Sequence, residues 1–177
     1  MPERAEIVAK LEREAGRLVE RYRSLSPDDL TRHCTESEVD GATSWCAKDH
    51  LAHLAMIERA FNSMIRRTVD GNSNPVGLDL SKGREAAIAR VHKNNQDNIE
   101  EHRDDDLDAL LADLDAARAE TLELLGCLTD EQLALPVPGA PWNDGTVGGV
   151  LITNAYHQIQ HWKWVEEGLG IVAAASD

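Results

Sequence analysis

Two histidines four residues apart, His157 and His161, are the residues of this sequence best suited to hold a metal ion. On an α-helix this spacing places both imidazoles on one face, about 6 Å apart along the axis, so that two nitrogens can converge on one cation. Asn154 lies one turn earlier on the same face. Three polar side chains thus occupy positions that helical periodicity reserves for the interior, which predicts either a metal pair or buried, hydrogen-bonded histidines.

A third ligand must come from another part of the chain, and residues 49–54 offer two candidates, His50 and His53. His50 lies one turn before Leu54 and His53 one turn before Ile57, so both flank the apolar face of the helix predicted there. Periodicity alone does not choose between the two rings.

Three neighbouring side chains add hypotheses about catalysis. Asp49 precedes His53 by four residues and can accept that ring's second N–H, or it can simply favour the helix N-terminus as a first-turn acid. Cys46 falls in the first turn, where backbone N–H groups lower a thiol pKa, although a small apolar role is the alternative. Asn154 either orients a substrate or bonds a neighbouring helix. We take Asn154 and Cys46 as weak catalytic candidates, and Asp49 as an outer hydrogen-bond partner.

Helical periodicity runs through most of the chain and predicts the elements that must position these residues. The long helices are expected over residues 3–24, 44–69, 84–102, 107–128 and 146–167. Short capped helices are expected after Ser26 and Thr129, and residues 34–43 and 136–145 are expected to be loops. No segment alternates like a strand. The sequence therefore predicts an all-α fold, a four-helix bundle with additional short helices and loops, in a single domain over residues 1–177 whose core covers about 5–169.

The composition limits the function. Thirty-two acidic residues against eighteen basic ones give a net charge of −14, which repels the phosphates that a nucleic-acid binder must neutralise. No apolar run approaches the roughly 20 residues that span a bilayer, and the first residues lack the apolar region of a signal peptide, so we expect a cytoplasmic protein that binds no membrane. The cysteines at positions 34, 46 and 127 are expected to be reduced thiols.

The segment from Trp45 to Leu54 resembles the DinB-family pattern W-S-x-x-D/E-x-L-x-H-L, with Cys46 in place of the serine. Residues 144–147 followed by His157-x-x-x-His161 resemble the last helix of that superfamily, and the resemblance spans about residues 5–169. It implies a four-helix bundle in which His53, His157 and His161 bind nickel, zinc or iron, with His50 as a neighbour. Three neutral imidazoles would leave an open coordination position for water or a substrate atom.

The same resemblance implies a range of activities. The superfamily includes thiol-dependent transferases and isomerases that use mycothiol or bacillithiol, a group of hydrolases, and members without known activity. We therefore expect a metal-dependent enzyme that acts on a small electrophilic substrate. The leading hypothesis is a thiol S-transferase with a low-molecular-weight thiol as cosubstrate. The alternatives are a protein that binds and sequesters a small molecule, and a non-catalytic structural dimer. Homodimerisation is frequent in the superfamily and compatible with all three.

Overall fold

The computed structural model describes residues 2–171, and helices predominate among these residues. The helices are α1 (Arg4–Arg23), α2 (Pro27–Thr31), α3 (Ala47–Val69), α4 (Arg84–His102), α5 (Leu107–Cys127), α6 (Asp130–Leu133) and α7 (Val147–Leu169). Two short strands, β1 (His33–Thr35) and β2 (Trp45–Cys46), precede α3. The predicted helical fold class is confirmed.

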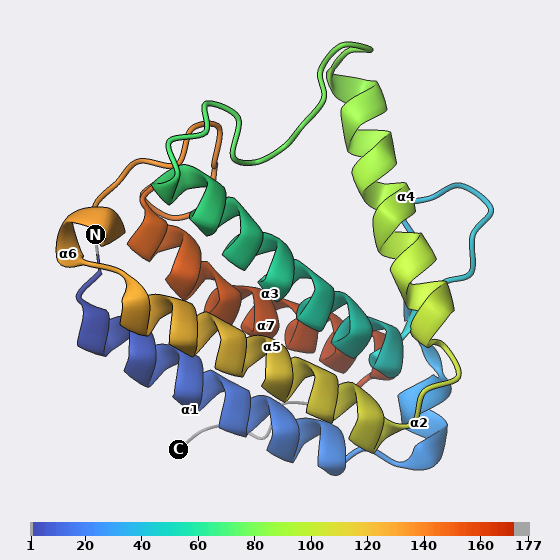
Figure 1. Ribbon diagram of the computed structural model, residues 1–177. Coiled ribbons are helices and arrows are strands. Elements are labelled where there is room, and N and C mark those ends of the chain that lie inside the picture. The colour runs from blue at the N-terminus through green and yellow to red at the C-terminus, as the bar shows by residue number, and fades with distance from the viewer. Residues whose placement is uncertain (1, 172–177) are drawn as a thin grey trace.

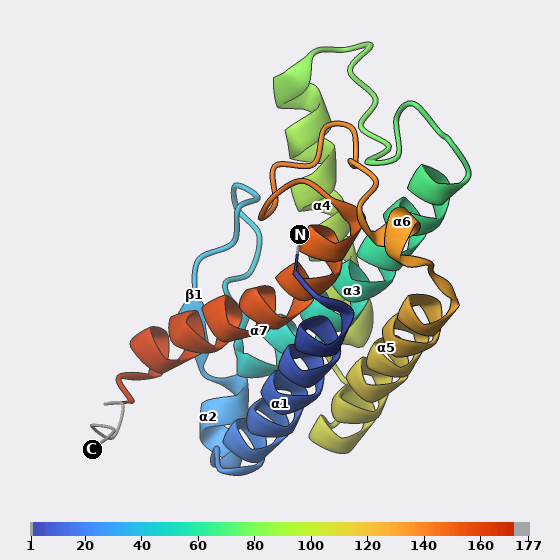
Figure 2. The same cartoon turned by 90° about the vertical axis from the view of Figure 1, so that its left-hand side faces the viewer.

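Four long helices, α1, α3, α5 and α7, lie side by side and form the bundle (Figure 1). Helices α1 and α7 run in one direction and α3 and α5 in the other (Figures 1 and 2). Helix α4 stands beside one end of the bundle, where it packs on α3, and the short α6 lies at the opposite end. The beginning of α3 and the second half of α7 therefore meet at the end that α4 covers.

The helix boundaries follow the capping residues that the sequence predicts. Ser26 accepts a hydrogen bond from the backbone N–H of Asp29 at 3.1 Å, and Thr146 accepts one from Gly149 at 3.0 Å. These side chains satisfy N–H groups that have no partner within a first helical turn. Gly170 ends α7 in the left-handed conformation, with φ of 67°. The helix therefore extends beyond the expected end at residue 167, and Gly168 lies inside it.

The strand pair corrects two expectations. Strands β1 and β2 pair antiparallel, with His33 opposite Cys46 and Thr35 opposite Trp45, so residues 34–43 are not wholly a loop. Helix α3 consequently begins at Ala47 rather than near residue 44. Strands of two and three residues are too short to produce a recognisable alternation, so they could not be predicted from periodicity.

Helix α7 passes very close to β1 at Gly168. A Cβ atom added to this glycine would overlap the backbone of Cys34. The close approach therefore requires a residue without a side chain, and it fixes the strand against the helix that carries His157 and His161.

The bundle interior consists of two apolar clusters with polar side chains between them. One cluster includes Ile7 and Leu124, and the other includes Leu18 and Leu110. In each of the four helices a buried polar residue falls between the two clusters along the chain: Glu14, Glu58, Arg118 and Gln158.

Two of these residues form a closed ion pair. The guanidinium of Arg118 donates to both carboxylate oxygens of Glu58, at 2.6 and 3.0 Å, and to the backbone oxygen of Leu11. Thr121 donates to Glu58 at 2.8 Å and accepts from the amide of Asn62 at 3.0 Å. This network, called the Glu58–Arg118 network below, links α1, α3 and α5.

Candidate metal centre

The structure brings His53, His157 and His161 together. Each ring offers one nitrogen, and these three atoms lie within 4.8 Å of one another. The ring centroids are 4.4 Å apart for His157 and His161, 4.8 Å for His53 and His161, and 5.3 Å for His53 and His157. Helices α3 and α7 run antiparallel and pack on each other, so the first turns of α3 face the middle of α7.

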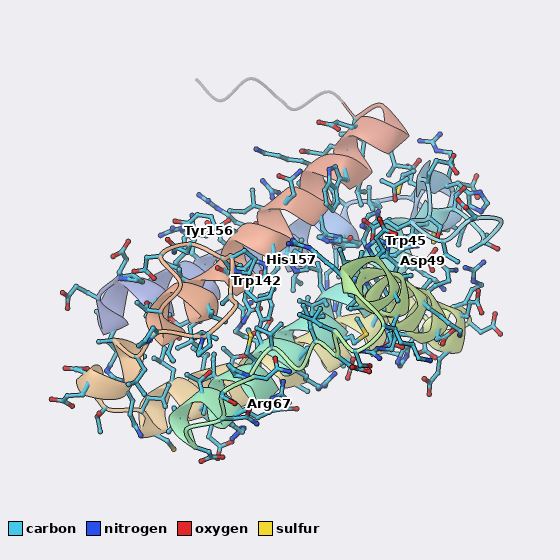
Figure 3. All side chains as sticks on the ribbon, turned by 90° about the horizontal axis from the view of Figure 1, so that it is seen from above. Trp45, Asp49, Arg67, Trp142, Tyr156 and His157 are labelled. Atoms are coloured by element: carbon cyan, nitrogen blue, oxygen red, sulfur yellow. The ribbon has the colours of Figure 1, made fainter. Side chains whose placement is uncertain are left out.

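The three rings adjoin a cavity of about 420 Å³. His50, Trp45 and Trp164 also line it, and Thr35, Glu36 and Glu38 line it from the segment before α3. In Figure 3, His157 lies on the side of α7 nearer Trp45, whereas Tyr156 lies on the other side of the helix. A small molecule can therefore reach the three imidazoles from this cavity.

Burial keeps the imidazoles neutral. Removal from water, together with the neighbouring His157 and His50, lowers the pKa of His53 from its usual value near 6.5 to about 3. The same desolvation lowers the pKa of His157 to about 4 and that of His161 strongly. A neutral ring is the form that donates a lone pair to a metal ion, so all three are in the right protonation state near pH 7.

His50, which spacing could not separate from His53, lies outside the group of three. Its Nδ1 is 2.7 Å from Nδ1 of His161, and its Nε2 is 3.0 Å from the hydroxyl oxygen of Thr35. The ring is 1% exposed, and burial lowers its pKa to about 4. His50 is therefore hydrogen-bonded to one of the three rings rather than placed among them.

The expected hydrogen bond between Asp49 and His53 is absent. Asp49 instead accepts the backbone N–H of Cys46 at 2.8 Å, which is the N-terminal role that the sequence offered as its alternative. Nδ1 of His53 is buried and has no hydrogen-bond partner within residues 2–171.

Of the two roles that the sequence leaves open for Cys46, the structure favours the small apolar one. Cys46 is the residue before α3 and is buried, and desolvation together with the nearby Asp49 carboxylate raises its pKa. A thiol of this kind is a weak nucleophile at neutral pH, so Cys46 packs as a small apolar residue. Cys34 and Cys127 are likewise free thiols.

Three further side chains of α7, Asn154, Trp162 and Trp164, differ in burial and in whether they line the cavity. Asn154 is 2% exposed, but it does not line the cavity, and its amide nitrogen has no hydrogen-bond partner in the described part of the chain. Trp164 is 39% exposed and lines the cavity, while Trp162 is buried against Tyr22. The buried stripe of α7 continues through Gln158, Trp162 and Val165.

Trp45 contributes more to the site than the sequence indicated. Its ring centroid lies 5.3 Å from that of His50 and 5.2 Å from that of His53. The indole N–H donates to the side-chain oxygen of Gln96 on α4 at 3.1 Å. Helix α4 thereby holds the Trp45 ring against the histidines. This contact explains why the polar helix carries a buried amide side chain at Gln96. No local motif signals a contact between residues 51 positions apart.

Comparisons with known proteins agree with the fold. A family model described as the DinB superfamily matches residues 41–165, a range that contains α3, α4, α5 and all four clustered histidines. A crystal structure of an uncharacterised protein from Escherichia coli UTI89 superposes with a TM-score of 0.60 at 14% identity, covering 93% of this chain and 91% of that one. At this identity the likeness concerns the fold alone. No curated protein matches the chain.

Proposed function

The chain belongs to the DinB superfamily, and on that premise we propose that it holds one divalent cation, nickel, zinc or iron, on His53, His157 and His161. We propose further that it is an enzyme that transfers a low-molecular-weight thiol to a small electrophilic substrate. One observation carries the proposal: three neutral imidazoles from two helices offer nitrogens within 4.8 Å of one another beside a cavity.

The donor set fits a divalent cation. The lowered pKa values leave each ring with a free lone pair near pH 7, and the buried Nδ1 of His53 lacks a hydrogen-bond partner among the described residues. A buried polar atom without a hydrogen-bond partner lowers the stability of the fold by about 1–3 kcal/mol. A cation bound by the three rings would offset this loss, because the lone pairs of the rings would then face a positive charge. Three protein ligands leave a coordination position for a substrate atom.

A bound cation with an open position lowers the pKa of a thiol or water and so supplies a nucleophile at neutral pH. Residues of the chain line the cavity and supply groups that can accept a proton. Trp45 and Trp164 line the cavity and exclude water from one side of the histidines. Glu36 and Glu38 line the same cavity from an exposed segment, so carboxylates are available there to take up the proton that the nucleophile releases.

One observation favours binding and sequestration as the second candidate. Apart from the histidines, the acid–base groups lining the cavity are Glu36 and Glu38, both exposed. Hydrolysis and many transfer reactions require a placed general acid for the leaving group. A protein that only retains a small molecule needs none. The third alternative, a purely structural role, predicts rings too far apart to share an ion, and the 4.8 Å separation counts against it.

The proposed cation site is tested by metal analysis of purified protein and of protein reconstituted with nickel, zinc and iron. We expect about one equivalent per chain, and its loss in His157→Ala with unchanged far-UV circular dichroism. His102→Ala is the matched control, since His102 bonds Asp105 outside the cavity. Wild-type protein that binds no metal after reconstitution would remove the basis of the proposal.

Transfer is tested separately, with loaded protein and a panel of electrophiles in the presence of glutathione, bacillithiol or mycothiol. Product that depends on both metal and thiol supports the enzyme. A ligand that raises the melting temperature by mass action without being converted supports the binding protein instead.

Homodimerisation and a cytoplasmic location are further proposals, which rest on the resemblance and the sequence composition. Within residues 2–171, none of the helices is both long and apolar enough to cross a bilayer. Size-exclusion chromatography with light scattering tests the dimer.

A further inference from the structure

We infer that His50 and Thr35 form a hydrogen-bonded relay that sets the tautomer and orientation of His161, which makes His50 a positioning residue for the proposed cation. This inference deepens the proposed function and rests on it. It concerns a residue that does not itself belong to the group of three histidines.

The relay joins three elements of the fold. Thr35 lies on β1, His50 in the first turn of α3, and His161 on α7. The two Nδ1 atoms are 2.7 Å apart, and the Nε2 atom of His50 is 3.0 Å from Oγ1 of Thr35. Both distances are those of ordinary hydrogen bonds.

The positions of the protons follow from the atoms involved. Because Nδ1 of His161 faces His50, only its Nε2 is left to ligate an ion, and that nitrogen needs a free lone pair. The neutral His161 ring must then carry its hydrogen on Nδ1 and donate it to Nδ1 of His50. His50 in turn carries its hydrogen on Nε2, which donates to the hydroxyl oxygen of Thr35. With both bonds in this direction, every ring nitrogen of the pair is used once.

The opposite direction is incompatible with ligation. If Nδ1–H of His50 donated to His161, the single hydrogen of a neutral His161 ring would lie on Nε2 and block the lone pair. An acceptor at the position of His50 Nδ1 therefore selects the tautomer of His161 that can bind metal. Outer hydrogen bonds of this kind commonly fix the ring orientation of metal-binding histidines.

Packing holds His50 in the required orientation. The ring is 1% exposed, and its centroid lies 5.3 Å from that of Trp45 and 6.4 Å from that of Trp164. Among the three proposed ligands, His161 is the one that makes a hydrogen bond to another side chain in the part of the chain that the structure describes. His50 thus acts on a single, identifiable ligand.

The test compares His50→Leu, which removes the acceptor, with His50→Asn, whose side-chain oxygen can take the place of Nδ1. Affinity for zinc is measured by competition with a chelator on purified full-length protein. Loss of an outer partner typically weakens metal affinity about 10- to 100-fold, and we expect that loss for His50→Leu. His50→Asn should recover most of it. His102→Leu, the matched control outside the cavity, should bind zinc like the wild type.

A second measurement reads the tautomer directly. In the zinc-loaded wild type, long-range ¹H–¹⁵N correlation spectra should show His161 with its hydrogen on Nδ1 and His50 with its hydrogen on Nε2. Thr35→Val should weaken zinc binding less than His50→Leu, and Thr68→Val, which removes a buried hydroxyl bonded within α3, should not weaken it.

The outcomes separate this inference from the proposed function. Wild-type protein without affinity for metal overturns both. If the wild type binds zinc and His157→Ala does not, but His50→Leu binds as tightly as the wild type, only the relay is overturned. A His50→Asn variant as weak as His50→Leu, with both correctly folded by circular dichroism, also overturns it, as does a zinc-loaded His161 with its hydrogen on Nε2.

Discussion

Two groups of buried polar side chains start only five residues apart on α3, and their hydrogen-bonding requirements are met in different ways. In the Glu58–Arg118 network both oxygens of the carboxylate accept from the guanidinium, and Thr121 adds another donor. In the histidine cluster, Nδ1 of His53 has no partner within the described residues, and the rings open on a cavity. Both groups are buried except for His157, which is half-buried, but only the first is complete without a ligand.

The difference shows that burial of polar residues is not in itself a sign of function. A network whose donors and acceptors all pair with one another contributes to the uniqueness of the core and leaves nothing for a ligand to do. A cluster of lone pairs without matching donors requires something from outside the chain. Satisfaction of hydrogen bonds, rather than burial, distinguishes the candidate site from the structural network.

The largest expected effect tests the closed network. Arg118→Met leaves the buried Glu58 carboxylate without its counter-charge, and breaking a buried pair in this way costs about 3–5 kcal/mol of unfolding free energy. The measurement is urea denaturation. Replacing both partners, Glu58→Met with Arg118→Met, should cost less than the single change, since no charge is left unpaired.

Metal binding by the Arg118→Met variant tests whether the two groups of polar residues are independent. Folded Arg118→Met protein should bind metal like the wild type, whereas His157→Ala should lose the metal with a smaller loss of stability. A single Arg118→Met variant as stable as the wild type would contradict the predicted cost of breaking the buried pair. A folded Arg118→Met variant that lacks metal would show that the two groups are not independent.

A smaller effect is expected from pH on the metal-free protein. Folded His53 stays neutral down to a pKa of about 3, while in the unfolded chain the ring takes up a proton below its usual value near 6.5. Between these values the unfolded state binds more protons, so stability decreases as the pH falls. For one such ring the loss from pH 7 to pH 5 is about 2 kcal/mol.

Urea denaturation of the wild type and of His53→Leu at both pH values, with a chelator present, checks this sign. The wild type should lose about 2 kcal/mol more than the variant over this interval, because the variant lacks one buried imidazole. An equal loss in the two proteins would mean that His53 is protonated as easily when folded as when unfolded.

The smallest effect concerns the exposed side of the cavity. Glu36 and Glu38 line it, so a negatively charged thiol such as glutathione is repelled on approach. Replacing both by glutamine should raise the apparent affinity for an anionic thiol by a few-fold, because exposed charges act weakly. The gain should vanish at high ionic strength. Glu123→Gln, which removes an exposed acid on α5, is the control for net charge.

Much of the fold could be predicted because local signals determine it. Capping residues such as Ser26 and Thr146, and apolar residues at three- and four-residue steps, mark the helices almost to the residue. The strand pair and the burial of Trp162 rather than Trp164 could not be predicted, because both depend on contacts between distant segments.

The candidate site could likewise be predicted only where local spacing determines it. The spacing of His157 and His161 places both on one helix face, but the choice between His50 and His53 needed the family resemblance. The hydrogen bond between His50 and His161 spans 111 positions of sequence, and that between Trp45 and Gln96 spans 51. The roles of Asp49 and Cys46 likewise depend on capping and burial, which the position of a residue in a helix does not reveal by itself.

The contact between Gly168 and Cys34 extends the site to a residue that has no functional group. Thr35 follows Cys34 directly in strand β1. How closely the strand packs on α7 therefore also determines where the Thr35 hydroxyl lies relative to His50. A methyl group at position 168 would push the strand outward and lengthen the relay at its far end. An inventory of chemically reactive side chains would therefore overlook one of the positions where tolerance to substitution is lowest.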